Sequence, residues 1–354
     1  MGKQMKTKLQ SLLATTIVFL LLSGTAFLPM RAIAQEVKYV GMCNASAAVA
    51  LDTNKFIVAD DENNILRNYD RNVTAQPFQT VSLSQIFPGE IQDGEDLEID
   101  LEGAAVLGDK IFWIGSHSTS KKGKFRPARH RLFALQIKPD AGGEFVPTRV
   151  GKIYTTLVAD LEKDTRFKKY KIHEAKTIAP KDIGGLSIEG LAATPEGTLL
   201  IGFRNPLSEG KVENGRLVGG KALLVTLLNP LEVIDDKEAK EARFGNPIDL
   251  DLDGYGIRSI EARNKNEYLI VAGPYHENLG TEGQKREESR LYFSSDKWSD
   301  KPRWLEKIRL NDLNIEAAFF YPQDGEKYVQ LLSDDGKSSC NNSFRSRAEM
   351  IETR

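Results

Sequence analysis

The chain has 354 residues, which is enough for one large domain or two ordinary ones. It carries 48 Lys and Arg against 50 Asp and Glu, so its formal charge is −2. This mildly acidic composition, with basic residues spread along the chain, is not typical of nucleic-acid-binding proteins.

Residues 1–34 are predicted to be a secretory signal peptide. Three lysines form a basic start, an apolar stretch follows, and Ala32-Ile33-Ala34 supplies a cleavage site of small residues. The alternative is an uncleaved membrane anchor, although Ser23-Gly24-Thr25 interrupts the apolar stretch. We expect a mature protein that is secreted or periplasmic, has no membrane span and is a monomer.

A degenerate repeat organises the rest of the chain, residues 35–354. Each copy joins a short apolar run to a turn and a second run of high β-propensity. Four copies are "DLEGAAVLGDKIFWIGSHS", "SIEGLAATPEGTLLIGFRN", "SIEARNKNEYLIVAGPY" and "NIEAAFFYPQDGEKYVQLLSDDG". An earlier copy, "NASAAVALDTNKFIVADDEN", has an alanine at the glutamate position. The equivalent positions are then predicted to be Ala45, Glu102, Glu189, Glu261 and Glu316.

The spacing of these positions predicts the fold. The intervals are 57, 87, 72 and 55 residues, and the shorter ones fit one four-stranded propeller blade. A helix-like insertion at 155–180 and a polar loop at 235–247 lengthen the other two. The sequence therefore predicts a single all-β domain, a β-propeller with five blades, with six blades as the alternative.

The final copy is short of strands after Asp335, whereas "EVKYVG" at the start of the mature chain is a strand without a blade. We expect this strand to complete the last sheet and close the ring. Closure would bring Cys43 and Cys340 to one junction, where a disulfide can form in an oxidising compartment. Two unrelated thiols remain the alternative.

The first strand of each blade lines the channel of a propeller, and the second strand returns to the same mouth. The repeated glutamates are therefore expected to gather there. Converging carboxylates raise each other's pKa values or require a cation, and Ca²⁺ prefers oxygen ligands. The candidate calcium ligands are Glu102, Glu189, Glu261 and Glu316. Hydrogen bonds that join neighbouring blades are an alternative role for them.

Basic residues at the same mouth indicate a small anionic ligand, such as a phosphate ester. A basic segment at 121–131 leaves this mouth, although it can also be an ordinary solvated loop. The candidate ligand-binding residues are Arg204, Arg258, His117, Asp60 and Asp334. The four histidines lack zinc-type spacing, and there is no G-x-S-x-G or Walker motif.

The segment "DLDLDGYGIRSIEA" resembles a calcium loop at first sight. As an EF-hand it fails, because its twelfth position is Ile260 and no flanking helices are apparent. It is better interpreted as the acidic lead-in to an inner strand. Asp249, Asp251 and Asp253 remain candidates for a peripheral calcium site.

Several of these motifs, among them "NASAAVALDTNKFIVADDENNILRNYD" and "IEGLAATPEGTLLIGFRNPL", resemble an uncharacterised bacterial secreted family, domain of unknown function 3616, over roughly residues 40 to 335. The shorter Ile/Leu-Glu-Gly element is similar to phytase-like and SdiA-regulated propellers, in which such glutamates line a calcium-containing channel. That likeness implies calcium and phosphoester hydrolysis. Glu261-Ala262 and Glu316-Ala317 depart from its Glu-Gly form.

Two hypotheses about function follow. The first is a calcium-dependent phosphoester hydrolase. The second is a non-catalytic propeller that binds a peptide, glycan or protein, in which calcium is only structural.

Overall fold

The computed structural model describes residues 36–94, 96–139, 145–213, 216–276, 287–310, 313–322, 327–334 and 341–351. All of them belong to one compact unit, Ala34–Arg354. The predicted signal peptide and Cys340 lie outside the described residues. Within those residues, no helix has both the length and the apolar character needed to span a membrane.

The fold contains five antiparallel sheets of four strands each, as the repeat predicts. The first sheet contains β2 (Ala45–Ala50), β3 (Lys55–Asp60), β4 (Ile65–Asp70) and β5 (Thr74–Ser82). The second contains β6 (Leu101–Leu107), β7 (Lys110–Gly115), β8 (Leu132–Pro139) and β9 (Phe145–Tyr154). The third contains β10 (Ser187–Ala193), β11 (Leu199–Ser208), β14 (Lys221–Leu227) and β15 (Ile248–Leu250).

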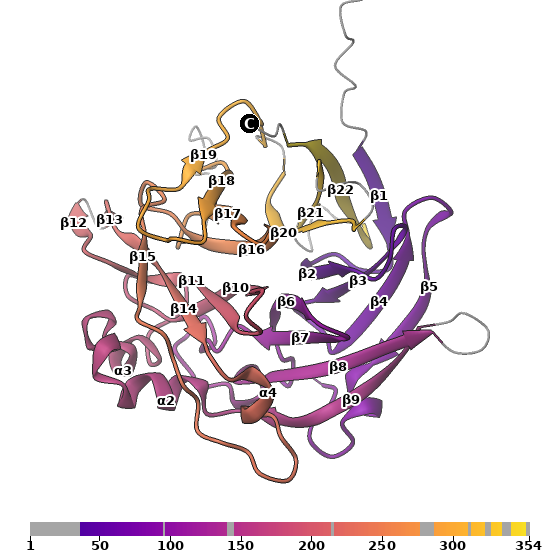
Figure 1. Ribbon diagram of the computed structural model, residues 1–354, viewed down its shortest axis with the longest axis horizontal. Helices are drawn as coiled ribbons and strands as arrows, with labels where there is room; N and C mark the ends of the chain where they lie inside the picture. Colours follow the sequence, from indigo (N-terminus) through magenta and orange to yellow (C-terminus); the bar gives the residue numbers. More distant parts are fainter. Residues whose placement is uncertain are drawn as a thin grey trace, which may run out of the picture. The chain divides into compact units, whose positions relative to one another are not determined.

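The fourth sheet contains β16 (Gly256–Asn264), β17 (Glu267–Gly273), β18 (Arg290–Ser295) and β19 (Arg303–Trp304). The fifth contains β20 (Ile315–Phe320), β21 (Tyr328–Ser333), β22 (Ser343–Met350) and β1 (Glu36–Val40). The inner strands β2, β6, β10, β16 and β20 pack against one another in this order, and β20 also contacts β2. The sheets therefore form a closed five-bladed propeller around a central channel (Figure 1).

The apolar core is divided among the contacts between neighbouring sheets. Five clusters of buried side chains are present, and each joins two adjacent blades. Because both faces of a blade are covered, strands such as β3, β11 and β21 are buried along almost their whole length, and their apolar residues form runs rather than alternating with polar ones. This packing explains why continuous apolar runs, and not amphipathic strands, mark the repeat.

The strand β1 closes the ring, as predicted. It pairs antiparallel with β22, so that Val40 lies opposite Ser343 and Tyr39 opposite Phe344. The last sheet thus takes three strands from the end of the chain and one from residues 36–40. The sequence analysis did not find β22, because its polar sequence "SFRSRAEM" lacks the apolar run of the other strands.

The longer intervals contain the expected insertions. Between the second and third sheets lie α2 (Leu157–Lys163), the 3₁₀ helix η2 (Thr165–Tyr170) and α3 (Ile172–Ala175). Their apolar residues join the cluster between these two sheets. Smaller elements elsewhere are α1 (Leu83–Ile86), η1 (Pro127–Arg129), α4 (Pro230–Val233) and the hairpin of β12 (Lys211–Glu213) with β13 (Arg216–Val218).

We expect Cys43 and Cys340 to form a disulfide, a prediction that extends beyond the described residues. The backbone N–H of Gly41 donates to the carbonyl of Asn342 at 2.9 Å, and each of these two residues lies two positions from one of the cysteines in the sequence. Intact-mass analysis of the protein before and after reduction should show the gain of two hydrogen atoms. Alkylation of both thiols in the unfolded, unreduced protein would contradict the bridge.

Candidate functional site

The inner strands share an irregularity near the start of each strand. In all five inner strands the pairing with the second strand skips one residue, which lies in a bulge. The skipped residues are Ser46, Glu102, Glu189, Arg258 and Glu316. All five line one cavity of about 850 Å³. We call them the bulge ring.

The bulge ring corrects two of the predicted equivalences. Ala45 is paired regularly with Asp60, so Ser46 holds the repeated position in the first blade. In the fourth blade that position belongs to Arg258, whereas Glu261 pairs with Leu269 three residues further along β16. Glu261 does not line the cavity, and burial raises its pKa to about 8. The predicted gathering of four glutamates is therefore wrong: three glutamates and an arginine gather instead.

The ends of the second strands also reach the cavity, although not with all of the predicted residues. Asp61, Arg204 and Asp334 line it. Asp60 does not, and its carboxylate accepts the backbone N–H of Glu62 at 2.9 Å. His117 is buried outside the cavity, where its Nδ1 lies 2.8 Å from the carbonyl of Gly115. Burial and the neighbouring His130 lower the pKa of His117 to about 3, which fits a neutral structural histidine.

A second set of polar residues was missed by sequence reasoning. The residue two positions before the bulge ring is Asn44, Asp100, Ser187 or Asn314 in four blades, and each lines the cavity. Asp100 has φ 57°, a left-handed conformation that few residues other than glycine adopt. The recurrence of a short polar residue two positions before the glutamate was the signal available in the sequence.

One side of the cavity is neutralised within the protein. The Arg204 guanidinium donates to Glu189 at 2.9 Å and to the carbonyls of Pro274 and His276 at 3.0 Å each. Arg258 contacts Glu189 through Nε at 3.0 Å and Glu316 through Nη2. Burial alone would raise the pKa of Glu189, but Arg204 and Arg258 outweigh it and lower that pKa. This side is a buried network of carboxylates and guanidinium groups.

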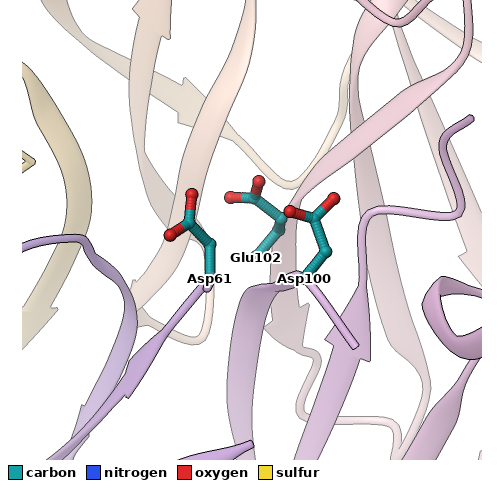
Figure 2. Close-up of side chains that lie close together, drawn as sticks. All are labelled: Asp61, Asp100 and Glu102. Atoms are coloured by element: carbon teal, nitrogen blue, oxygen red, sulfur yellow. The ribbon is translucent and has the colours of Figure 1, made fainter. Parts of the chain in front are cut away.

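The opposite side carries a carboxylate group with little compensation. Ligand oxygens of Asp61, Asp100 and Glu102 lie within 4.8 Å of one another. Figure 2 shows these three side chains side by side, from the end of β3 and the start of β6. Arg129 pairs with Asp100 at 2.8 Å, but among the described residues no basic side chain forms an ion pair with Asp61 or Glu102.

The pKa values of all three carboxyl groups are raised in this arrangement. Burial, followed by the charges of Asp100 and Asp334, raises the pKa of Asp61 well above its ordinary range. Burial, followed by the charge of Glu189, does the same to the pKa of Glu102. The pKa of Asp100 is also raised, by burial, although Arg129 opposes the shift. The group therefore favours either bound protons or a bound cation.

One buried oxygen atom of this group and one beside it have no hydrogen-bond partner among the described residues. They are Oδ1 of Asp61 and Oδ1 of Asn44, and Asn44 is only 5% exposed. Both residues line the cavity. Buried polar atoms without partners are rare, and hard oxygen donors of this kind suit Ca²⁺. These residues fit a calcium ion better than the four glutamates predicted from the repeat.

The peripheral acidic segment is organised differently. Asp249 accepts hydrogen bonds from Tyr170 and Ser208 at 2.7 Å each, and it also contacts Lys169. Lys301 pairs with Asp251 at 3.1 Å and with Asp253 at 2.9 Å. Among the described residues, the carboxylate groups able to hold a metal do not include these three aspartates. Lysines and hydroxyl groups satisfy them, which favours a structural role.

The basic segment at 121–131 contributes to the cavity only in part. Lys121 and Arg129 line it, whereas Arg126 forms an ion pair with Asp96. Ten carboxylates and five basic side chains line the cavity altogether. The site is therefore more acidic than the sequence analysis anticipated.

Solved structures share only distant similarity with the chain. A luciferin-regenerating enzyme is 10% identical, with a TM-score of 0.42, and the match covers 90% of this chain and 96% of that one. A thermostable family-43 glycoside hydrolase is 11% identical, with a TM-score of 0.45 and coverage of 90% and 91%. A gluconolactonase from Xanthomonas campestris is 9% identical, with a TM-score of 0.37 and coverage of 90% of each chain.

No curated protein matches the chain. The likeness to phytase-like propellers stays a prediction from short motifs. A model of the family described as "Protein of unknown function (DUF3616)" matches residues 44–136 and 149–284, more than half of the chain, and the protein therefore belongs to this family.

Proposed function

We propose that the protein binds calcium through Asp61, Asp100 and Glu102, and that the bound ion recruits a small anionic ligand into the cavity. The observation that carries the proposal is the close approach of these three half-buried carboxylates, two of which have no ion-pair partner among the described residues. Extracytoplasmic calcium is abundant enough for a site of modest affinity. Secretion of the mature protein is therefore part of the proposal.

The donor set decides which metal fits best. Asp61, Asp100, Glu102 and Asn44 offer oxygen ligands, and the described residues that line the cavity include neither histidine nor cysteine. Hard oxygen ligands favour Ca²⁺ over zinc or copper, which prefer nitrogen and sulfur. Once bound, calcium supplies positive charge that offsets the carboxylates and attracts an anion.

The charges of the cavity determine how an anion can bind. Arg204 and Arg258 were expected to hold it, but both guanidinium groups are engaged with Glu189, Glu316 or backbone carbonyls. The excess of carboxylates repels an anion when no cation is present. We therefore expect anion binding to depend on calcium, with Lys121 at the cavity wall as an additional contact.

Calcium should raise the thermal stability of the wild-type protein, and a chelator should reverse the effect. At a calcium concentration 100 times the Kd, binding to the folded state stabilises it by about 2.7 kcal/mol. Melting followed by circular dichroism measures the shift. Asp61→Asn should abolish it, whereas Asp253→Asn, which lies outside the cavity, should retain it. An equal shift in wild type and Asp61→Asn would place the ion elsewhere.

A phosphate ester is the ligand class to test first, and hydrolysis separates the two hypotheses about function. Turnover of phytate or a phosphomonoester that requires calcium and is lost in Asp61→Asn supports a hydrolase. The engaged state of Arg204 and Arg258 favours the second candidate, a non-catalytic binding protein. Calcium-dependent binding of inorganic phosphate without turnover, measured by calorimetry, supports a non-catalytic role in which calcium takes part in binding an anion and is not only structural. If neither turnover nor phosphate binding is observed, the proposal of an anionic ligand is contradicted. A peptide, glycan or protein is then the remaining class of partner.

A further inference from the structure

The channel contains a second carboxylate group that is able to surround a cation. Ligand oxygens of Glu102, Glu189 and Glu316 lie within 4.8 Å of one another. Glu102 belongs to this group and to the proposed calcium site, so the two groups adjoin. In the second group, the guanidinium of Arg258 contacts two of the three carboxylates.

Arg258 is built into this position. It occupies the bulge of β16, where three other blades place a glutamate. Its side chain passes over Gly273, where an added Cβ would lie 3.0 Å from Cγ of Arg258. Gly273, which lies in β17 opposite Gly256, must therefore be a small residue. The absence of a side chain at Gly273 leaves room for the side chain of Arg258.

The partners of Arg258 are themselves fixed. Arg204 holds Glu189 on one side, and the Asn314 amide donates to Glu316 at 3.0 Å. Glu189 and Glu316 are 3% and 6% exposed, so neither carboxylate can turn to water without repacking. A buried charge of this kind is stable only while a counter-charge is present. Arg258 supplies that counter-charge permanently.

We propose that Arg258 is a built-in cation that takes the place of a second metal ion among Glu102, Glu189 and Glu316, and that it limits the channel to a single divalent ion. The single ion itself rests on the proposed function, whereas the exclusion of a second ion by Arg258 does not. The guanidinium group forms ion pairs with Glu189 and Glu316, and its positive charge occupies the place among the carboxylates that a second calcium ion would need.

The test is the number of calcium ions bound per chain, measured by equilibrium dialysis of the full-length mature protein. Arg258→Ala should bind about one ion more than wild type, since the vacated carboxylates recruit it. The additional ion should also stabilise the variant against heating. Arg204→Ala is the matched control: it removes the same charge from the same cavity but leaves Arg258, so no additional ion is expected. A gain of one ion in both variants would overturn the specific role of Arg258, as would no gain in Arg258→Ala.

A second variant keeps the proposal testable if Arg258→Ala does not fold. Glu316→Gln removes one carboxylate from the second group and none from the first, so it should bind the wild-type number of ions. Loss of one ion in Glu316→Gln would show that the second group already holds metal and would overturn the proposal. If wild type binds none while Arg258→Ala binds one, the role of Arg258 stands and the proposed function fails.

Discussion

Glu189→Gln is expected to lower the free energy of unfolding by about 3–5 kcal/mol, because removal of one partner leaves buried charges uncompensated. Glu189 accepts a hydrogen bond from Arg204 at 2.9 Å and forms an ion pair with Arg258 at 3.0 Å, and a neutral amide of the same size cannot offset two guanidinium groups. Urea unfolding followed by circular dichroism measures the loss, both with calcium and with a chelator.

The matched control for this prediction is Asp109→Asn, which makes the same chemical change in an exposed pair with Lys110. Exposed ion pairs contribute little, so its unfolding curve should coincide with that of wild type. A Glu189→Gln variant as stable as wild type would show that the ion pairs of Glu189 do not stabilise the fold. Arg204 and Arg258 would then be compensated by solvent or by bound ions instead.

Tyr39→Ala is expected to cost about 3–5 kcal/mol, the range for deletion of a large buried aromatic side chain. Tyr39 lies in β1 and is 2% exposed. Its ring lies 5.1 Å from that of Phe56, 5.3 Å from that of Tyr69 and 5.5 Å from that of Phe344. These partners belong to β3, β4 and β22, so one side chain joins the first and last blades. Thermal and urea unfolding measure the effect.

The control is Tyr328→Ala in β21 of the same sheet, where the tyrosine is 45% exposed. Its substitution should change stability much less, because little apolar surface is uncovered. Tyr39→Phe should also remain close to wild type, since it keeps the ring contacts. Equal losses in Tyr39→Ala and Tyr328→Ala would show that the aromatic cluster does not stabilise the ring closure.

The fold was predictable because its determinants are local. Each blade repeats an apolar run, a turn and a second apolar run, and the intervals between copies match the size of a blade. Ring closure by residues 36–41 followed from an unpaired strand at one end and a shortage of strands at the other. The strand β22 was missed because it lies near the outside of its sheet, where apolar residues are not required along its whole length.

The site was predicted less well, for a reason that the fourth blade makes clear. Its "SIEA" imitates the "SIEG" of the third blade, but the strand β16 begins three residues earlier, at Gly256. An added Cβ at Gly256 would lie 2.0 Å from the carbonyl oxygen of Arg204, so only glycine fits where β16 enters the ring. This contact between blades fixes the register and places Arg258 in the bulge. The local sequence pattern does not reveal a contact with a neighbouring blade. The motif alone therefore predicted Glu261 at the repeated position.

The pairing of β1 with β22 also determines when the propeller can be completed during synthesis. The two strands are separated in the sequence by the four other sheets, so the fifth sheet cannot form until the last strand has emerged. Contacts of such long range form slowly, because the entropy of closing the intervening chain must be lost first. Until then β1 and the aromatic side chains beneath it are exposed, and an unpaired strand edge of this kind can pair with another chain. The edge of β1 that pairs with β22 in the folded protein therefore stays open to other chains until β22 has been synthesised.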